Sequence, residues 1–487
     1  MAIRTRITPE AKLPFAAQRL ELFTGAIGVL ATLYFVYVLA LQGFSTRLEA
    51  LVGLIIFLAL VVGFVMVPWI MAAGAIPFFA VLPTLKVFIT PTLGGVKDVI
   101  VFAAVAASCV LALQRRGARR QAHIDHGVLA LMGGLLVLYV VNVGGLISGE
   151  TGHNTAWFQG VRLFNEPLSM CLVGFTVTEP RRVLAAARTS LLLTAAAMAL
   201  VGIVQQALGV QRLVQYGYTY GTNVRQIGSH LRSFGTLDDP FVYASFLLLA
   251  LAVLAAAPRL LARHWVLLGI LSVGLLVSFV RTAAVVGLAL IGISLARRGR
   301  VAVAAFVVLI AVTAGATTLI SASDQSQTKT VAVNPTTYLT LNGRTKVWQS
   351  RLGHPANWPF GRGVGAIGSA AARAERSLSG KIVIGSRPTG STVVDSGYLS
   401  LVADVGFLGF SLFLMLMGRL VMLARRALAV RVEAGWLVIA VASVILLDAL
   451  SREAFTGYPS SYFTWLLLGL GGAVCVTELR ERRFALG

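Results

Sequence analysis

The stretch VVDSGYLSLVADVGFLGF (residues 393–410) has the composition of a membrane-spanning helix, yet it carries Asp395 and Asp404. A carboxylate at the centre of a bilayer costs about 2.5–3.5 kcal/mol on scales derived from helix insertion. Asp395 stands where the apolar run begins, at the membrane surface, whereas Asp404 lies well inside the run. The stretch therefore predicts a membrane helix with one acid that water can reach and a second, deeper acid that needs a polar partner.

The whole chain shares this apolar character. Of its 487 residues, 57% are hydrophobic and only 12% are charged, whereas a soluble globular protein carries about 25% charged residues. We therefore expect an all-α polytopic integral membrane protein. The net charge of +22 reports mainly the topology of such a protein, because Lys and Arg collect in cytoplasmic loops, and it does not indicate a nucleic-acid partner.

Apolar runs long enough to cross a bilayer, about 20 residues each, predict about 14 transmembrane helices. They lie near residues 23–42, 50–68, 74–90, 98–113, 127–147, 161–178, 189–208, 241–257, 265–280, 282–296, 301–320, 396–418, 434–450 and 459–477. The third is the weakest, because Pro77 and Pro83 interrupt it and Pro91 borders it. It could be a broken or re-entrant segment, which a membrane protein tolerates only where neighbouring residues satisfy the backbone.

The charged turns support this count. With both termini in the cytoplasm, the basic segments at 115–120, 179–182, 258–263, 297–300, 419–426 and 478–483 all fall on the cytoplasmic side, as the positive-inside rule requires. The chain then divides into N-terminal membrane helices (1–208), an extracytoplasmic loop (209–240), central membrane helices (241–320), a long basic extracytoplasmic loop (321–394) and C-terminal membrane helices (395–487). The basic N-terminal tail is interpreted as cytoplasmic, before a retained anchor helix.

The long loop is rich in positive charge. Residues 321–394 hold nine Lys or Arg residues against two acidic ones, Asp324 and Glu375. Connections of this length are usually functional or disordered. Because GRTKVWQSRL and SAAARAERSL within it have helix-forming compositions, we expect an ordered and partly helical cap.

Several arginines are expected at the outer membrane surface. Arg225 and Arg232 precede a span, Arg281 stands at the tip of a tight helical hairpin, and Arg344 and Arg351 share one helix face with Trp348 between them. Guanidinium groups bind phosphate oxygens in pairs and stay charged at any relevant pH, so their convergence would suit the pyrophosphate of a lipid. Each arginine could instead be an interfacial anchor, and for Arg281 we favour function.

Other polar and aromatic residues are weaker candidates. His230 lies between two of the arginines, and the aromatic side chains of Tyr218 and Trp348 could stack on sugar rings or belong to the interfacial belt. Gly363–Gly368 match GxGxxG, but without a preceding strand the motif does not indicate a dinucleotide site. Cys109, Cys171 and Cys475 lie in apolar runs, and neither they nor the histidines show metal-ligand spacing.

The two aspartates of the first stretch have different expected roles. Among the loop cations, Asp395 could act as a general base or orient a hydroxyl, and it could equally cap the helix. Asp404 precedes Gly406 and Gly409, which allow a close approach by a neighbouring helix. We interpret Asp404 as the partner of a buried polar group rather than as a catalyst.

Four motifs in order resemble those of the O-antigen ligase and polysaccharide polymerase superfamily. They are RSFGTLDDPFVYA (232–244), FVRTA (279–283), NGRTKVW with WPFGRGVG (342–365) and DSGYLSLVADVGFLG (395–409). The resemblance covers residues from about 230 to 420 and includes the long penultimate outer loop. It implies a glycosyltransferase of the bacterial cytoplasmic (inner) membrane that uses undecaprenyl-pyrophosphate-linked glycans on the extracytoplasmic face.

One departure from the family pattern is informative. The ligase branch has a histidine, a small polar residue, nine further positions and then GxxG; here Asp395, Ser396 and Gly406–Gly409 keep that spacing with Asp in place of His. This difference favours the polymerase branch. The resemblance then implies catalytic roles for Asp395, Arg281 and Arg232. It implies substrate binding by Arg225, Arg344, Arg351, His230, Trp348 and Tyr218.

The expected reaction needs no nucleotide or redox cofactor, and the sequence indicates no metal site. The expected partners are a lipid-linked oligosaccharide donor and acceptor, membrane lipids and other polysaccharide assembly proteins. Two alternatives stay open. A ligase would transfer the finished glycan to a lipid, wall or protein acceptor, and a flippase or transporter would move the lipid-linked oligosaccharide across the membrane.

Overall fold

The protein is described from a computed structural model, which places residues 47–114, 125–142, 154–220, 223–227, 230–257, 264–296, 348–349, 352–353, 359–378 and 396–486. Helices make up most of this part of the chain. They are α2 (Arg47–Met66), α3 (Pro68–Phe88), the 3-10 helix η1 (Pro91–Gly95), α4 (Val96–Gln114), α5 (His126–Val141), α6 (Asn154–Thr176), α7 (Pro180–Gln215), α8 (Pro240–Ala256), α10 (Trp265–Leu276), α11 (Arg281–Ala296), α15 (Gly368–Leu378), α16 (Gly397–Ala429), α17 (Ala434–Asp448) and α18 (Ser460–Leu486).

The fold is that of a membrane-embedded helical protein. Among the described residues, five helices are long and apolar enough to cross a membrane: Pro68–Phe88, Leu93–Gln114, Pro180–Gln215, Gly397–Ala429 and Ser460–Arg483. Several shorter apolar helices pack with them. The predicted spans 23–42 and 301–320 lie outside the described residues, so the total of 14 stays a prediction.

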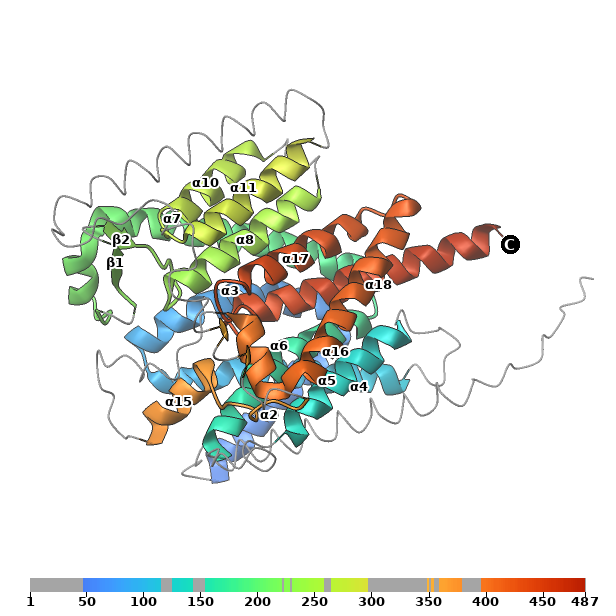
Figure 1. Cartoon of the computed structure of the whole chain (residues 1–487), viewed down its shortest axis with the longest axis horizontal. Helices are drawn as coiled ribbons and strands as arrows, with labels where there is room; N and C mark the ends of the chain where they lie inside the picture. The colour runs from blue at the N-terminus through green and yellow to red at the C-terminus, as the bar shows by residue number, and fades with distance from the viewer. Residues whose placement is uncertain are drawn as a thin grey trace, which may run out of the picture.

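The two ends of the molecule differ in character. In Figure 1 the C-terminus lies at one end of the long axis, and the opposite end carries α15 and a small ribbon of β1 (Arg225–Ile227) and β2 (His230–Arg232). The strands are antiparallel and pair Arg225 with Arg232. Within the described residues this ribbon is the one sheet in a fold predicted to be all-α.

The core of the bundle is built around α8 and α18. Every residue of α8 from Tyr243 to Ala256 is buried, which explains why its sequence is apolar on all sides. Helix α18 packs closely on α6, because a Cβ added at Gly469 would stand 2.2 Å from the Cys171 carbonyl oxygen. Close approach through small residues is the usual way in which membrane helices pack.

Helix α3 is continuous, although its prolines suggested a broken segment. Proline lacks an N–H, so Pro77 and Pro83 leave the carbonyls of Ala73 and Phe79 without their helical partners. Both carbonyls find replacements, since the Ser190 hydroxyl donates to Ala73 at 2.6 Å and the Tyr458 hydroxyl donates to Phe79 at 3.0 Å. Side chains from α7 and the α17–α18 connection thereby keep the helix intact.

Helix α16 covers the predicted span 396–418, and its helical backbone is interrupted at Gly406. Gly406 has φ +67°, a left-handed conformation outside the helical region, and a Cβ there would stand 2.0 Å from the Pro359 carbonyl oxygen. The interruption receives backbone from the 359–365 loop, with the Leu408 N–H donating to that same carbonyl at 3.1 Å. Only glycine permits this conformation and this approach without strain.

The connection between α7 and α8 forms a small cap. It was predicted to begin at residue 209, and Gly209 is where the α7 backbone leaves the helical conformation, with φ +73°. Beyond it, Leu213, Tyr218, Val224, Leu231 and Phe234 form a separate hydrophobic cluster. The second predicted loop helix is confirmed as α15, and most of the first, 343–352, lies outside the described residues.

Candidate functional site

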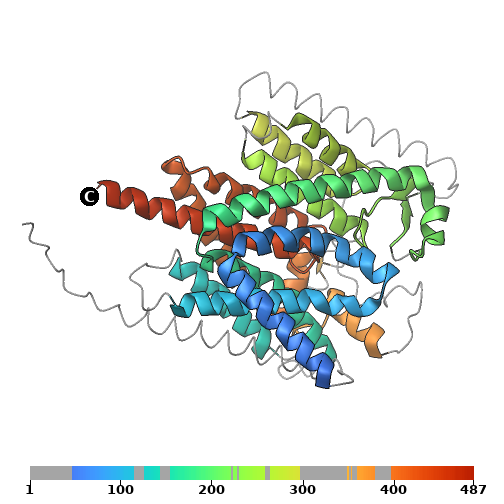
Figure 2. The same cartoon turned by 180° about the vertical axis from the view of Figure 1, so that it is seen from behind.

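Polar and charged side chains gather at the end of the bundle that carries β1, β2 and α15. Figure 2 shows this end from behind, with the α10–α11 hairpin beside the ribbon. The hairpin is held to the ribbon by backbone, because Ser233 N–H donates to the Val277 carbonyl at 3.0 Å. Arg281 is the first residue of α11, at the hairpin tip where the sequence predicted it.

Three of the predicted arginines come together here. Arg225 and Arg232 are paired across the ribbon. Arg225 forms an ion pair with Asp239 at 3.0 Å. Arg232 reaches from the ribbon to the hairpin, where its Nη2 donates to the Phe279 carbonyl at 3.1 Å, and its guanidinium carbon lies 4.5 Å from the centre of the Phe241 ring.

Arg225 and Arg281 lie near enough to Arg232 for their charges to act on its guanidinium group. Burial lowers the pKa of the Arg232 guanidinium, the neighbouring charges of Arg225 and Arg281 lower it further, and the Asp239 carboxylate partly opposes them. An arginine remains charged despite such a shift. Its Nε is buried and has no hydrogen-bond partner among the described residues. The cluster of Arg225, Arg232 and Arg281, called the arginine cluster below, therefore has the charge and a donor to receive an anion.

The other predicted binding residues fall into two groups. His230 lies in β2, and its ring stacks on Phe279 with centroids 5.7 Å apart, so it borders the arginine cluster. Tyr218 is buried between Phe88 and Phe234, at ring distances of 5.5 and 5.0 Å, which favours a packing role over stacking on a sugar.

Four further predicted residues cannot be placed in contact with the cluster. Trp348 is half-buried, and it and Gln349 have helical backbone. Asp395, Arg344 and Arg351 lie outside the described residues. The sequence left open that Asp395 caps α16, but the N-cap position belongs to Ser396.

The connection between α17 and α18 joins the arginine cluster to the start of α16. The Ser451 hydroxyl lies 3.1 Å from that of Thr282, the residue after Arg281. On its other side, the Gly397 N–H is 2.8 Å from the Arg452 carbonyl oxygen. Arg452 is fixed by the buried Asp448, to which its Nε donates at 2.8 Å. The α17–α18 connection therefore contacts both the start of α11 and the first turn of α16.

Asp404, the deeper acid, has the structural role that was predicted. Its Oδ1 accepts a hydrogen bond from the Gly365 N–H at 3.0 Å. Gly365 belongs to the GRGVGAIG loop, in which Gly361, Gly363, Gly365 and Gly368 all have positive φ. Asn142 contributes as well, since its side-chain N–H donates to the Phe360 carbonyl at 2.8 Å. The glycine-rich loop thus closes the interruption of α16 and is not a dinucleotide site.

A second charged group was missed in the sequence. Lys97 and Asp98 on α4 and Arg162 and Glu166 on α6 form a network of ion pairs that joins these helices to α18. Lys97 Nζ donates to Glu166 at 2.8 Å, and the Tyr462 hydroxyl donates to the same carboxylate at 2.6 Å. We call these four residues the buried ionic network. Averaging hydropathy over each span hid it, although the four-residue spacing of Arg162 and Glu166 was a visible signal.

The described residues offer neither a metal-ligand group nor a disulfide. In the described part of the chain, no group of three His, Cys, Asp or Glu side chains could hold a metal ion. The three cysteines are buried and unbridged, as predicted for small core residues.

Comparison with models of known protein families found no match to this chain, and comparison with the sequences of curated proteins found none either.

Proposed function

We propose that this membrane protein is a polysaccharide polymerase that extends a glycan carried on undecaprenyl pyrophosphate. The observation that carries the proposal is the arginine cluster, in which Arg225 and Arg232 are paired across the ribbon, Arg225 forms an ion pair with Asp239, and the charge of Arg281 acts on Arg232. Guanidinium groups gathered at the surface end of membrane helices suit a ligand with several negative charges. The pyrophosphate of a lipid carrier has that charge, and its tail would lie between the apolar helices.

The chemistry assigned to the cluster is electrostatic. The acceptor hydroxyl oxygen attacks the anomeric carbon of the donor glycan, and the bond from that carbon to the pyrophosphate oxygen breaks with its electron pair. Arg225, Arg232 and Arg281 would stabilise the charge that develops on the leaving pyrophosphate. Arg344 was assigned the same role from the sequence. The acceptor proton would pass to a nearby carboxylate, and Asp395 is the residue that the motif spacing indicates.

The proposal places the reaction on the extracytoplasmic face of a bacterial cytoplasmic membrane. Donor and acceptor would both be lipid-linked oligosaccharides. The orientation rests on the basic turns at the other end of the helices. The leaving pyrophosphate is already charged, so the transfer requires neither a nucleotide nor a redox cofactor.

A transporter is supported less well, although interrupted helices are a feature of many transporters. Two helices are interrupted here, α7 at Gly209 and α16 at Gly406. At Gly406 the polar groups that a substrate or ion would need are already engaged, with Pro359 and Asn142 supplying the partners. This internal satisfaction favours an enzyme over a carrier.

The test uses the purified protein in lipid vesicles with one synthetic undecaprenyl-pyrophosphate-linked repeat unit and no other acceptor. We expect a ladder of longer lipid-linked products. Transfer that occurs only when a lipid, wall or protein acceptor is added would replace the polymerase with a ligase. Movement of the intact lipid across the bilayer without any new glycosidic bond would replace it with a flippase.

A further inference from the structure

The tip of the α10–α11 hairpin contains a backbone conformation that its sequence does not favour. Helix α10 ends at Leu276, and Phe279 then adopts φ +51°, in the left-handed region. A residue in this conformation often ends a helix, but it is usually glycine, because a Cβ makes the conformation unfavourable. A bulky aromatic residue there is uncommon, and such outliers cluster at functional sites.

One other non-glycine residue shares this conformation within the described part of the chain. It is Arg431, with φ +60°, which lies just beyond the C-terminus of α16. The Arg431 side chain is exposed, and a basic residue near a helix C-terminus interacts favourably with the helix dipole. Phe279 has no charge, so the explanation for its conformation lies in the contacts that it makes.

Phe279 contacts the ribbon through both its backbone and its ring. Its carbonyl accepts a hydrogen bond from Arg232 Nη2 at 3.1 Å. Its ring stacks on that of His230, with centroids 5.7 Å apart and planes inclined by 20°. Both partners belong to β2, so a single residue ties the tip of the hairpin to the strand that carries Arg232.

These contacts set the positions of two arginines of the cluster. The bond to the Phe279 carbonyl fixes Nη2 of Arg232, while the buried Nε of Arg232 has no hydrogen-bond partner among the described residues. On the other side of Phe279, the Val280 N–H donates to the Ser278 hydroxyl oxygen at 3.2 Å. Arg281 follows directly and begins α11. The turn at Phe279 therefore determines where Arg281 stands relative to Arg232.

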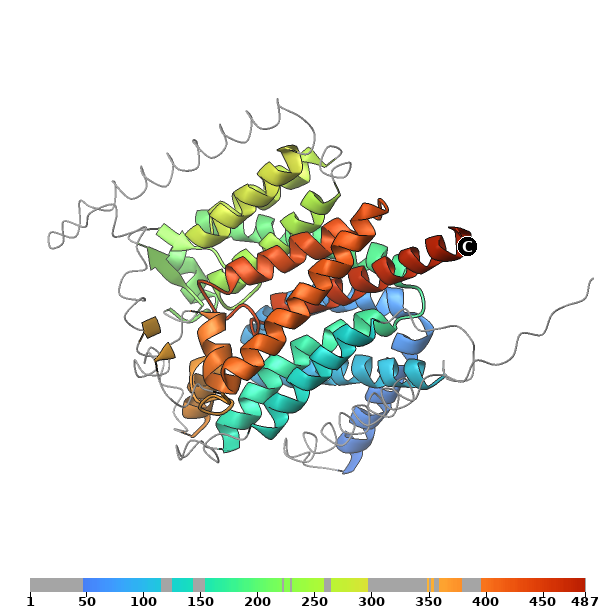
Figure 3. The same cartoon turned by 45° about the vertical axis from the view of Figure 1, so that its right-hand side comes forward.

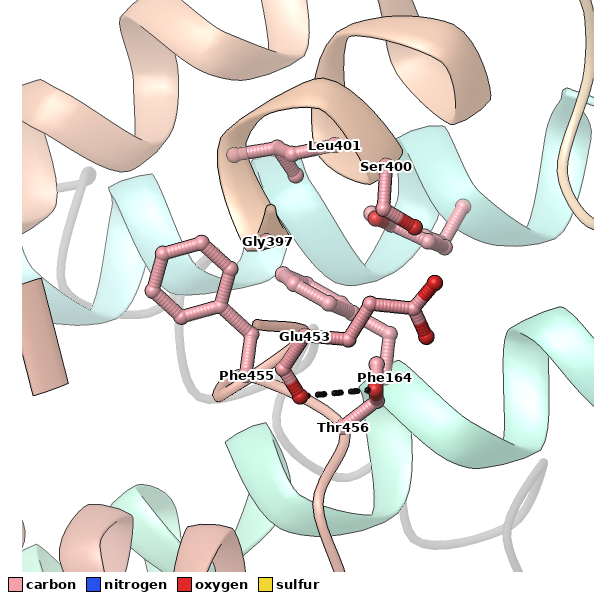
Figure 4. Close-up of a pocket in the computed structure, with 8 residues that line it drawn as sticks. Phe164, Gly397, Ser400, Leu401, Glu453, Phe455 and Thr456 are labelled. Carbon is pink, nitrogen blue, oxygen red and sulfur yellow. Dashed lines mark hydrogen bonds between the residues drawn. The ribbon is translucent and has the colours of Figure 1, made fainter. Parts of the chain in front are cut away.

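The start of α11 is supported on another side by the α17–α18 connection. The Ser451 hydroxyl lies 3.1 Å from that of Thr282. Within the connection, the Thr456 hydroxyl donates to the Glu453 carbonyl at 3.3 Å, as Figure 4 shows. The cavity beside these two residues measures about 10 Å³, which is room for about one water molecule. The connection therefore supports the hairpin closely and leaves the contacts of Phe279 to set the tip.

We propose that Phe279 is a positioning residue, which holds Arg232 and Arg281 in the arrangement that binds the pyrophosphate of the lipid-linked donor. The inference rests on the proposed function for the identity of this anion. Donors that are already in place need no rearrangement when the ligand binds, so a loosened tip would weaken binding. The stacked ring and the bonded carbonyl offset the unfavourable backbone conformation.

The experiment compares Phe279→Gly with Phe279→Ala in the whole protein in lipid nanodiscs. Both variants remove the ring, but glycine favours the left-handed conformation and alanine does not, so the glycine variant should unfold at the higher temperature. Both should nevertheless bind inorganic pyrophosphate about tenfold more weakly than the wild-type protein, as measured by calorimetry, because one aromatic contact is lost. Affinity that instead follows stability, with the glycine variant at the wild-type value, would overturn the inference.

Two further variants serve as controls. Phe279→Tyr keeps the ring, so it should bind pyrophosphate as the wild-type protein does. Arg431→Gly relieves the same backbone conformation at the far end of α17 and should leave the affinity unchanged. A loss of affinity in either control that equals the loss in Phe279→Gly would also overturn the inference.

Elongation of the lipid-linked repeat unit is measured separately, so that failure of the positioning role and failure of the polymerase function can be told apart. A wild-type protein that forms no longer product, but whose variants bind pyrophosphate in the expected order, would lose the polymerase function and keep the positioning role. A wild-type protein that elongates the glycan, with Phe279→Gly equal to it in rate and in pyrophosphate affinity, would keep the function and lose the positioning role.

Discussion

The arginine cluster and the buried ionic network are both built from basic and acidic side chains and differ in how far those charges are exposed. The network sets Lys97 and Arg162 against Asp98 and Glu166, and all four side chains are buried, with exposures of 18% or less. Each of its charges has an opposite partner. A low-dielectric interior requires such pairing, because an unpaired charge there is prohibitively costly.

The arginine cluster lies at the surface, whereas the network is buried. Arg281 is exposed, and Arg225, which forms an ion pair with Asp239, is 37% exposed. Figure 3 shows the ribbon and α15 together at one end of the bundle. Exposed guanidinium groups are screened by water and can be reached by an anionic ligand. The comparison teaches that the exposure of the charges, rather than charge alone, distinguishes structural support from a binding site in this protein.

The largest effect is expected in the network. Glu166→Ala leaves two cations against Asp98, so we expect a loss of about 3–5 kcal/mol in the free energy of unfolding, as for other broken buried pairs. Unfolding in mixed micelles measures it. The double variant Arg162→Met with Glu166→Gln removes one charge of each sign and should recover most of the loss. A loss below about 1 kcal/mol for Glu166→Ala would show that the network is not a structural support.

The second-largest effect is expected in the arginine cluster, and it should fall on activity rather than on stability. Arg281→Ala should reduce elongation by about 10²–10³-fold, the range for loss of one group that stabilises developing charge. Thermal unfolding should stay at the wild-type temperature, because the Arg281 side chain is exposed. Arg425→Ala, at an exposed position near the far end of α16, is the matched control. Normal product length in Arg281→Ala would contradict the assignment of the cluster.

The same contrast explains how far sequence reasoning reached. The helical membrane fold, the hairpin at Arg281 and the partnered role of Asp404 follow from hydropathy, spacing and the cost of a buried charge. The partners did not follow from sequence. Gly365 is 39 positions from Asp404, and Glu166 is 69 from Lys97, so only packing of the helices brings them together.

The continuity of α3 was missed for a related reason. A proline predicts a freed carbonyl, but not that Ser190 or Tyr458 will reach it. Local pattern predicts which residues need partners, and tertiary structure decides which partners they find.

A smaller effect is expected when the negative charge of Asp239 is removed from the arginine cluster. Asp239→Asn removes the carboxylate opposite Arg225 and keeps an amide oxygen for the Phe241 N–H, which Asp239 caps at 2.7 Å. A partly exposed pair of this kind is worth about 0.2–1 kcal/mol. We therefore expect inorganic pyrophosphate to bind up to about fivefold more tightly, as measured by competition for elongation. Weaker binding would mean that Asp239 supports the site rather than opposing its charge.

The smallest effect is expected from an ion pair near the surface, that of Asp125 and Arg419. It tests how much a partly exposed pair contributes to stability. Asp125 caps α5, accepting from the Val128 N–H at 3.1 Å, and it pairs with Arg419 at 3.0 Å. Burial alone would raise the pKa of Asp125, but the hydrogen bond and charge of Arg419, with the backbone N–H groups, outweigh it and hold the pKa below its ordinary value.

The sign of the pH dependence follows from that lowered pKa. The unfolded chain takes up the proton first as pH falls, so the ion pair stabilises the protein above the ordinary Asp pKa of about 3.9. The stabilisation disappears as pH falls through the lower pKa of the folded state. Asp125→Asn keeps a good capping residue, so it should cost only about 0.5 kcal/mol at pH 7 and nothing at a pH below both values. A difference between the proteins that persists at such a pH would show that Asp125 acts through packing and not through its charge.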